Sequence, residues 1–214
     1  MMHPWAMAGR TILRLILAMA LAATMSTACD DSEAVTPPSS HDLAEPWQAV
    51  PFDLDPATLA AAVAACRDVM GPGQVLPPLV VVDARGGNTV IVAYGMGGNT
   101  ADCSVVRDGS GRFTSMGGSA GSSIGEPPIG QGEVKSRGMS TTSVAGGIQA
   151  TYVVGRAGPA IAAVEVVIPG GPRVRASLAN GWFAAWWPGD FVNKPQPIAI
   201  NGFDGSGNLI GSGS

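Results

Sequence analysis

The sequence predicts a mainly β (α+β) fold, an antiparallel β-meander or sandwich-like domain with one N-terminal helix. Thirty glycines and a charged fraction of only 13% are typical of a β-rich chain with many tight turns rather than of a helical bundle. A helical pattern occurs once after the first 28 residues, starting at Pro56. Beyond it, short apolar runs alternate with turn residues almost to the end of the chain, as in a sheet built from hairpins.

The chain begins with the three parts of an export signal. Arg10 and Arg14 charge the first part, an apolar run of 11 residues follows from Leu15 to Met25, and Ser26-Thr27-Ala28 supplies small residues. Such a run fits a signal core of roughly 7–15 residues but is too short for a membrane span of about 20. We therefore expect residues 1–28 to be removed as a signal peptide and the protein to be exported.

Cys29 stands where bacterial lipoproteins carry their lipid. Thr27-Ala28-Cys29 resembles the lipobox, although Ser26 replaces the leucine or other aliphatic residue that the lipobox prefers. The chain has three cysteines, and an odd cysteine in an exported protein needs a partner or a modification. Lipid on Cys29 would leave Cys66 and Cys103 to form a disulfide. We expect a lipoprotein on the outer face of the cell membrane, with plain secretion as the alternative, because ordinary signal peptidase accepts the same small residues.

Residues 29–46 are expected to form a lipidated N-terminus and a flexible tether. Segment 30–46 is acidic, rich in Pro and Ser, and too poor in apolar residues to pack. Its 17 residues would span roughly 20–25 Å.

The exported chain keeps 10 basic and 16 acidic residues, a net charge of −6, and its cations are scattered, so nucleic acid is excluded as a partner. Residues 47–214 suit a single disulfide-bonded domain.

The predicted helix runs from Pro56 to about Val69. Asp55 is its N-cap, Pro56 suits the first helical position, and Gly71-Pro72-Gly73 ends it. The apolar residues of one side are Leu59, Val63, Cys66 and Met70. This spacing predicts that Cys66 faces the core.

The remaining segments predict two units of strands. The first unit, about residues 47–116, contains two hairpins, Leu79–Ala84 with Thr89–Tyr94 and Cys103–Arg107 with Arg112–Met116. A Gly/Ser/Pro-rich loop from Gly117 to about Gly138 leads to the second unit, about residues 139–214. The strands predicted there are Gly147–Val154, Ala160–Ile168, Arg173–Leu178, Trp182–Trp187 and Pro197–Phe203, followed by a turn at Asp204–Asn208.

The segment Trp182–Trp187 carries large rings on both faces of its predicted strand. Trp182 and Trp186 point to one side, and Phe183 and Trp187 to the other. One interpretation is a central strand with packed layers on both sides. The other is that one face, with Trp182, Trp186, Trp187 and the nearby Phe191, forms a binding surface for sugar rings or a partner protein.

No catalytic, metal or cofactor site is predicted. Gly117–Gly121 fits the G-x-S-x-G pattern around Ser119, but no helix can follow it and no histidine lies beyond His41, so we interpret it as a loop. Asp204-x-Ser206-x-Asn208 is interpreted as a turn rather than a calcium loop, and a zinc site would need an unusual all-carboxylate set. Carboxylates for glycoside hydrolysis meet only in the fold, and the candidates are Asp83, Asp102 and Glu165.

Several of these segments together resemble a group of uncharacterised actinobacterial exported or membrane-tethered proteins. The resemblance covers roughly residues 56–210 and is carried by Cys66, Asp83-Ala84-Arg85-Gly86, Cys103 and the run from Asn180 to Gly189. It implies no activity. From the sequence we expect an extracytoplasmic, lipid-anchored, non-enzymatic binding or interaction module with an envelope glycan or protein as partner. The alternative is a small envelope hydrolase that uses carboxylates.

Overall fold

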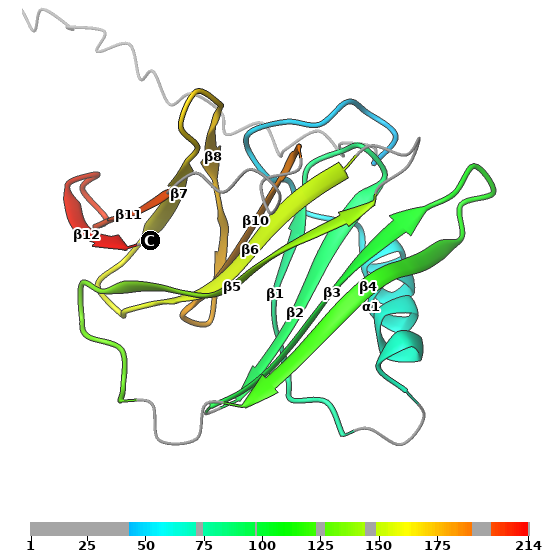
Figure 1. Cartoon of the computed structure of the whole chain (residues 1–214), viewed down its shortest axis with the longest axis horizontal. Helices are drawn as coiled ribbons and strands as arrows, with labels where there is room; N and C mark the ends of the chain where they lie inside the picture. The colour runs from blue at the N-terminus through cyan, green and yellow to red at the C-terminus, as the bar shows by residue number, and fades with distance from the viewer. Residues whose placement is uncertain are drawn as a thin grey trace, which may run out of the picture. The chain divides into compact units, whose positions relative to one another are not determined.

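The computed structural model describes residues 43–71, 75–96, 98–122, 127–143, 149–189 and 198–213 (Figure 1). Cys29, His41 and Phe191, which the sequence analysis singled out, lie outside these ranges. The elements in chain order are α1 (Pro56–Met70), β1 (Leu79–Ala84), β2 (Thr89–Met96), β3 (Asn99–Arg107), β4 (Phe113–Ser122), β5 (Val134–Ser143), β6 (Gln149–Ala157), β7 (Ala163–Val167), β8 (Arg173–Arg175), β9 (Ser177–Ala179), β10 (Trp182–Pro188), β11 (Ala199–Phe203) and β12 (Leu209–Gly213).

Over the described residues the strands form three four-stranded antiparallel sheets, so the mainly β fold with one helix is confirmed. Sheet A has the order β1-β2-β3-β4, sheet B the order β5-β6-β10-β9, and sheet C the order β12-β11-β7-β8. Among these residues no helix is long and apolar enough to cross a membrane.

The core consists of three apolar layers between four layers of structure. α1 packs on one face of sheet A, the other face of sheet A packs on sheet B, and the far face of sheet B packs on sheet C. Strand β2 shows how the sequence serves this arrangement: Val90 and Val92 face the helix, while Ile91 and Ala93 face sheet B. A strand buried on both faces needs no polar alternation, and after Thr89 the sequence of β2 has none.

The tryptophans of β10 lie in the core, and their prediction as an exposed binding surface is wrong. Trp182 and Trp186 pack between sheets A and B, whereas Trp187 packs between sheets B and C. Their exposed fractions are 5%, 2% and 0%. The physical reason is the position of β10, which pairs with β6 and β9 and has a sheet on each side. The interpretation as a central strand is confirmed.

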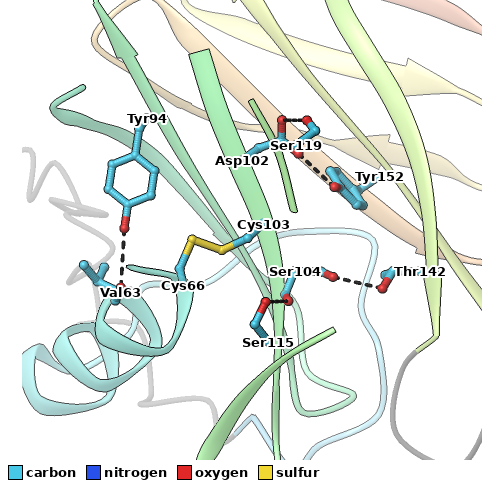
Figure 2. Close-up of a disulfide and its surroundings, with 10 residues drawn as sticks. All are labelled: Val63, Cys66, Tyr94, Asp102, Cys103, Ser104, Ser115, Ser119, Thr142 and Tyr152. Atoms are coloured by element: carbon cyan, nitrogen blue, oxygen red, sulfur yellow. Dashed lines mark hydrogen bonds between the residues drawn. A yellow bond between two sulfur atoms is a disulfide. The ribbon is translucent and has the colours of Figure 1, made fainter. Parts of the chain in front are cut away.

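The helix begins and ends almost where predicted. Asp55 accepts hydrogen bonds from the N–H groups of Ala57 and Thr58, each at 3.0 Å, and so satisfies two of the free donors at the helix start. Cys66 is fully buried on the side that faces sheet A. It forms the expected disulfide with Cys103 of β3, with their Cα atoms 5.9 Å apart (Figure 2).

Removing this disulfide should destabilise the domain without changing its fold. Replacing both cysteines by alanine frees a loop of 37 residues in the unfolded chain. The chain entropy regained there should lower the free energy of unfolding by about 2–4 kcal/mol. Urea titration of the double variant tests this, and a midpoint equal to that of the wild type would contradict a stabilising cross-link.

The predicted tether ends earlier than residue 46, because the chain is bound to the domain from Leu43 onward. Leu43 is buried, and its carbonyl and that of Glu45 accept hydrogen bonds from Asn88 and Gly87 at 2.6 and 2.7 Å. A Cβ on Gly86, whose φ is +86°, would lie 2.5 Å from the carbonyl oxygens of Glu45 and Pro46. A glycine is therefore required where this strap, residues 43–54, crosses the β1–β2 turn.

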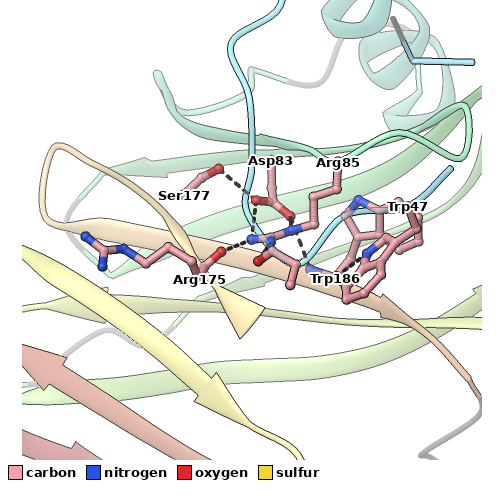
Figure 3. Close-up of polar contacts among 7 residues, drawn as sticks. Trp47, Asp83, Arg85, Arg175, Ser177 and Trp186 are labelled. Carbon is pink, nitrogen blue, oxygen red and sulfur yellow. Dashed lines mark hydrogen bonds and ion pairs between the residues drawn. The ribbon is translucent and has the colours of Figure 1, made fainter. Parts of the chain in front are cut away.

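A buried ion pair joins the strap to all three sheets (Figure 3). Arg85 donates two hydrogen bonds to the Asp83 carboxylate at 2.7 and 2.9 Å, one to the carbonyl of Ala49 at 2.6 Å, and one to the carbonyl of Arg175. Asp83 also accepts from the Ser177 hydroxyl at 2.7 Å and from the Trp186 N–H at 3.1 Å. Burial raises the pKa of Asp83, and the Arg85 guanidinium opposes this. These contacts use four of the five N–H donors of Arg85 and give each Asp83 oxygen two hydrogen bonds, which is the kind of compensation a buried pair requires.

Both ends of the loop predicted from Gly117 to about Gly138 are strand. β4 continues to Ser122, and β5 begins at Val134. The sequence signal was weak because both are edge strands rich in Gly and Ser, which carry little β propensity. Since sheets A and B share one core, the two sequence units pack as one body.

Candidate functional site

A polar groove opens where the edges of sheets A and B diverge, between β4 and β5. It consists of two cavities of about 400 and 110 Å³. Ser119, Ser140 and Tyr152 line both cavities, so the two adjoin at these side chains. The other half of the same inter-sheet layer is apolar and closed, with Trp182 and Trp186 in it. The layer thus changes from a packed core to a polar opening as it reaches the two edge strands.

Each wall of the groove contains a β-bulge. In β4, Ser115 lies opposite Val105 and Gly117 opposite Ser104, which leaves Met116 as the extra residue. In β5, Arg137 is extra in the same way, between Ser136 and Gly138. Met116 lines the larger cavity and Arg137 the smaller one. Bulges at sheet edges change the direction of side chains and are enriched beside active sites. A pair of bulges on facing walls therefore makes this groove a candidate binding site.

Asp102 of β3 is the central group of the groove (Figure 2). Its Oδ2 accepts a hydrogen bond from the Ser119 hydroxyl at 2.6 Å, and its Oδ1 accepts one from the Tyr152 hydroxyl at 2.8 Å. Ser119 lies directly opposite Asp102 on β4, whereas Tyr152 comes from β6 in the other sheet. The carboxylate therefore joins the two sheets at the point where they separate.

The environment of Asp102 favours its protonated form more than water does. Burial raises the pKa of this carboxyl above its ordinary value of 3.8, and the hydrogen bonds from Ser119 and Tyr152 oppose the rise. Burial and the negative charge of Asp102 raise the pKa of Tyr152, which stays a neutral donor. No ion pair of Asp102 exists among the described residues. A desolvated carboxylate held in a cleft by specific hydrogen bonds is a candidate functional group.

Small residues keep the groove open. A Cβ added to Gly117 or Gly138 would meet no atom within 4 Å, and neither residue has a left-handed φ. Most other side chains around the larger cavity are polar: the Ser104 hydroxyl donates to that of Thr142 at 3.0 Å, and Gln149 also lines it. The larger cavity is therefore lined mainly by hydroxyls, one amide and backbone, with Met116 and the Tyr152 ring as apolar surfaces.

The structure separates the three carboxylates that the sequence analysis considered. Asp102 lies in the groove, Asp83 is fully buried in its ion pair, and Glu165 binds Arg173 at 2.8 Å on sheet C. The loop interpretation of Ser119 is wrong, since this residue lies within β4 and donates to Asp102.

Sequence reasoning missed Tyr152, Ser140 and Arg137 as residues of the groove. They lie in β5 and β6; β6 was predicted as Gly147–Val154, but no strand was predicted over β5. A hairpin without a bulge would place Gly118, not Ser119, opposite Asp102, because the register changes by one residue at Met116. The alternation of Asp102 and Ser104 with apolar residues in β3 was the one available signal that this face of the strand is polar.

A separate cavity of about 1110 Å³ lies outside the groove, between the strap, β1 and the β8–β9 segment. Its walls include the exposed side chains of Val50 and Leu79, and Arg175 at the rim. Its lining also contains two carboxylates, Asp53 and Glu165, of which Glu165 is paired with Arg173 at 2.8 Å.

Comparison of the chain with protein-family models, with curated proteins and with solved structures gives no match. The function must therefore be argued from the groove itself.

Proposed function

We propose that this protein is an exported, lipid-anchored, non-enzymatic binding module of the cell envelope that holds a polar ligand in the groove between β4 and β5. The observation that carries the proposal is the groove's construction. Two bulged edge strands, two glycines that leave space and one desolvated carboxylate converge on a single opening. Concave sites with a few convergent polar groups are the usual form of small-ligand sites.

The chemistry of the groove supports binding over hydrolysis. A two-carboxylate glycosidase needs a second acid about 5–10 Å from the first. Of the described residues that line the groove, Asp102 is the single carboxylate. Both of its oxygens already accept short hydrogen bonds, which orient it as a fixed acceptor for a ligand.

Filling the groove should abolish binding while leaving the fold intact. Gly117→Leu and Gly138→Leu each place a side chain in open space. We expect detergent-solubilised protein carrying either change to bind membrane-free cell-wall material at least tenfold more weakly than the wild type. Thermal melting should be unchanged within a few degrees, because the new Cβ meets no atom within 4 Å and the side chain extends into the groove.

Gly205→Leu is the matched control, since a Cβ at Gly205 also meets nothing within 4 Å but lies in the β11–β12 turn on sheet C. Wild-type binding by both groove variants would refute the proposed site. Intact-mass analysis of the envelope form tests the anchor separately: we expect an acylated Cys29, and an unmodified soluble form would refute the anchor alone.

A further inference from the structure

We infer that the ligand of this groove is a neutral, hydroxyl-rich oligosaccharide. The inference rests on the proposed function and specifies its ligand class. It follows from the shape of the groove, its hydrogen-bonding groups, the sign of its charges and the placement of its apolar atoms.

The shape suits a ring with a substituent. The larger cavity, about 400 Å³, falls in the range of small-molecule sites, roughly 300–1,000 Å³. The smaller one, about 110 Å³, equals the volume of only a few water molecules at about 30 Å³ each. Because the two adjoin at Ser119 and Ser140, a sugar ring in the larger cavity lies next to the smaller one, which has the size of a hydroxymethyl or similar group with its water.

The lining offers both donors and acceptors within short range. Asp102 can only accept when ionised. Arg137, whose guanidinium also donates to the Gly98 carbonyl at 3.3 Å, can only donate. The Ser119 hydroxyl, whose hydrogen is donated to Asp102, can accept, and the Ser140 hydroxyl can do either. Gln149 adds an amide that donates and accepts. A ligand that satisfies such a mixed set must carry groups that both donate and accept, and neighbouring hydroxyls of a sugar do so.

The charges disfavour an ionic ligand of either sign. Asp102, which has no ion pair among the described residues, would repel a carboxylate or phosphate. Arg137 lines the same small cavity and would repel an ammonium group. Asp102 already receives two hydrogen bonds, so a cation would gain less from it than from a bare carboxylate.

Apolar contact is available beside these polar groups. The bulged Met116, 44% exposed, borders the larger cavity together with the flat backbone at Gly117 and Gly118. These surfaces can cover the C–H face of a sugar ring. They replace the tryptophan platform that the sequence suggested, because the three tryptophans of β10 are buried.

The test is a titration of the detergent-solubilised, full-length exported protein with matched hexasaccharides, followed by calorimetry. The neutral probes are hexamers of glucose, mannose, galactose and N-acetylglucosamine. The charged counterparts are hexagalacturonate and the glucosamine hexamer, which share a backbone with two of the neutral probes. We expect at least one neutral hexamer to bind, and both charged hexamers to bind at least tenfold more weakly than it.

Asp102→Asn keeps the shape but removes the charge and one acceptor, and should weaken binding of the neutral hexamer at least tenfold. Gly117→Leu should abolish it, and Gly205→Leu should leave it unchanged. The inference is overturned if no neutral hexamer binds, if a charged hexamer binds more tightly, or if the groove variants bind like the wild type. If the saccharides fail while Gly117→Leu still loses cell-wall binding, the ligand class is wrong and the proposed function stands.

Discussion

Trp187→Ala is expected to lower the free energy of unfolding by about 3–5 kcal/mol, the usual cost of removing a large aromatic side chain from a core. Trp187 is 0% exposed and packs between sheets B and C with Phe183 and Ala185 of the same strand. The loss combines the transfer free energy of the ring with that of the cavity left behind, since the two flanking sheets limit relaxation.

Urea titration followed by circular dichroism measures the effect. Trp187→Phe, which keeps a ring in place, should cost clearly less than the alanine variant. A loss below about 1 kcal/mol for Trp187→Ala would show that this ring contributes little to the core, contrary to its complete burial.

Asp83→Ala should also cost about 3–5 kcal/mol, because it leaves the Arg85 guanidinium buried without its counter-charge. Both side chains are 0% exposed, and hydrogen bonds from Ser177 and Trp186 would lose their acceptor as well. The effect should extend to the strap, whose Ala49 carbonyl accepts from Arg85. Hydrogen exchange at residues 43–54 should therefore rise more than in Trp187→Ala.

A double-mutant cycle identifies the cause. Replacing Asp83 by leucine and Arg85 by methionine together removes both charges, so the double change should cost less than the sum of the single changes. Additive losses would show that the two side chains stabilise the domain independently of each other, and would contradict a coupled pair.

The positions of the buried strands along the chain could be predicted from the sequence better than the segments with which they make contact. Rings on both faces of Trp182–Trp187 are consistent with a central strand, and the structure places β10 in the middle of sheet B. Its contact with Asp83, 103 residues earlier, could not be predicted, because pairing between distant segments depends on the whole core rather than on local preference.

The groove was less predictable for a local reason. Its walls are edge strands with Gly and Ser in place of β-branched residues, and the segment Gly117–Ser122 has the composition of a loop. The pairing of Asp102 with Ser119 depends on the bulge at Met116, and no residue type in this segment predicts such a bulge. Asp102 was one of three carboxylates considered, and only the fold distinguished it from Asp83 and Glu165.

The central claim, that the ligand lies between β4 and β5, is tested most directly by mapping amide chemical shifts during titration with solubilised cell-wall fragments. We expect the largest shift changes at residues 115–121 and 137–142 and at Asp102, and their loss in Gly117→Leu. Changes concentrated instead around Val50, Leu79 and Arg175, which line the separate cavity beside the strap, would contradict the assignment of the site.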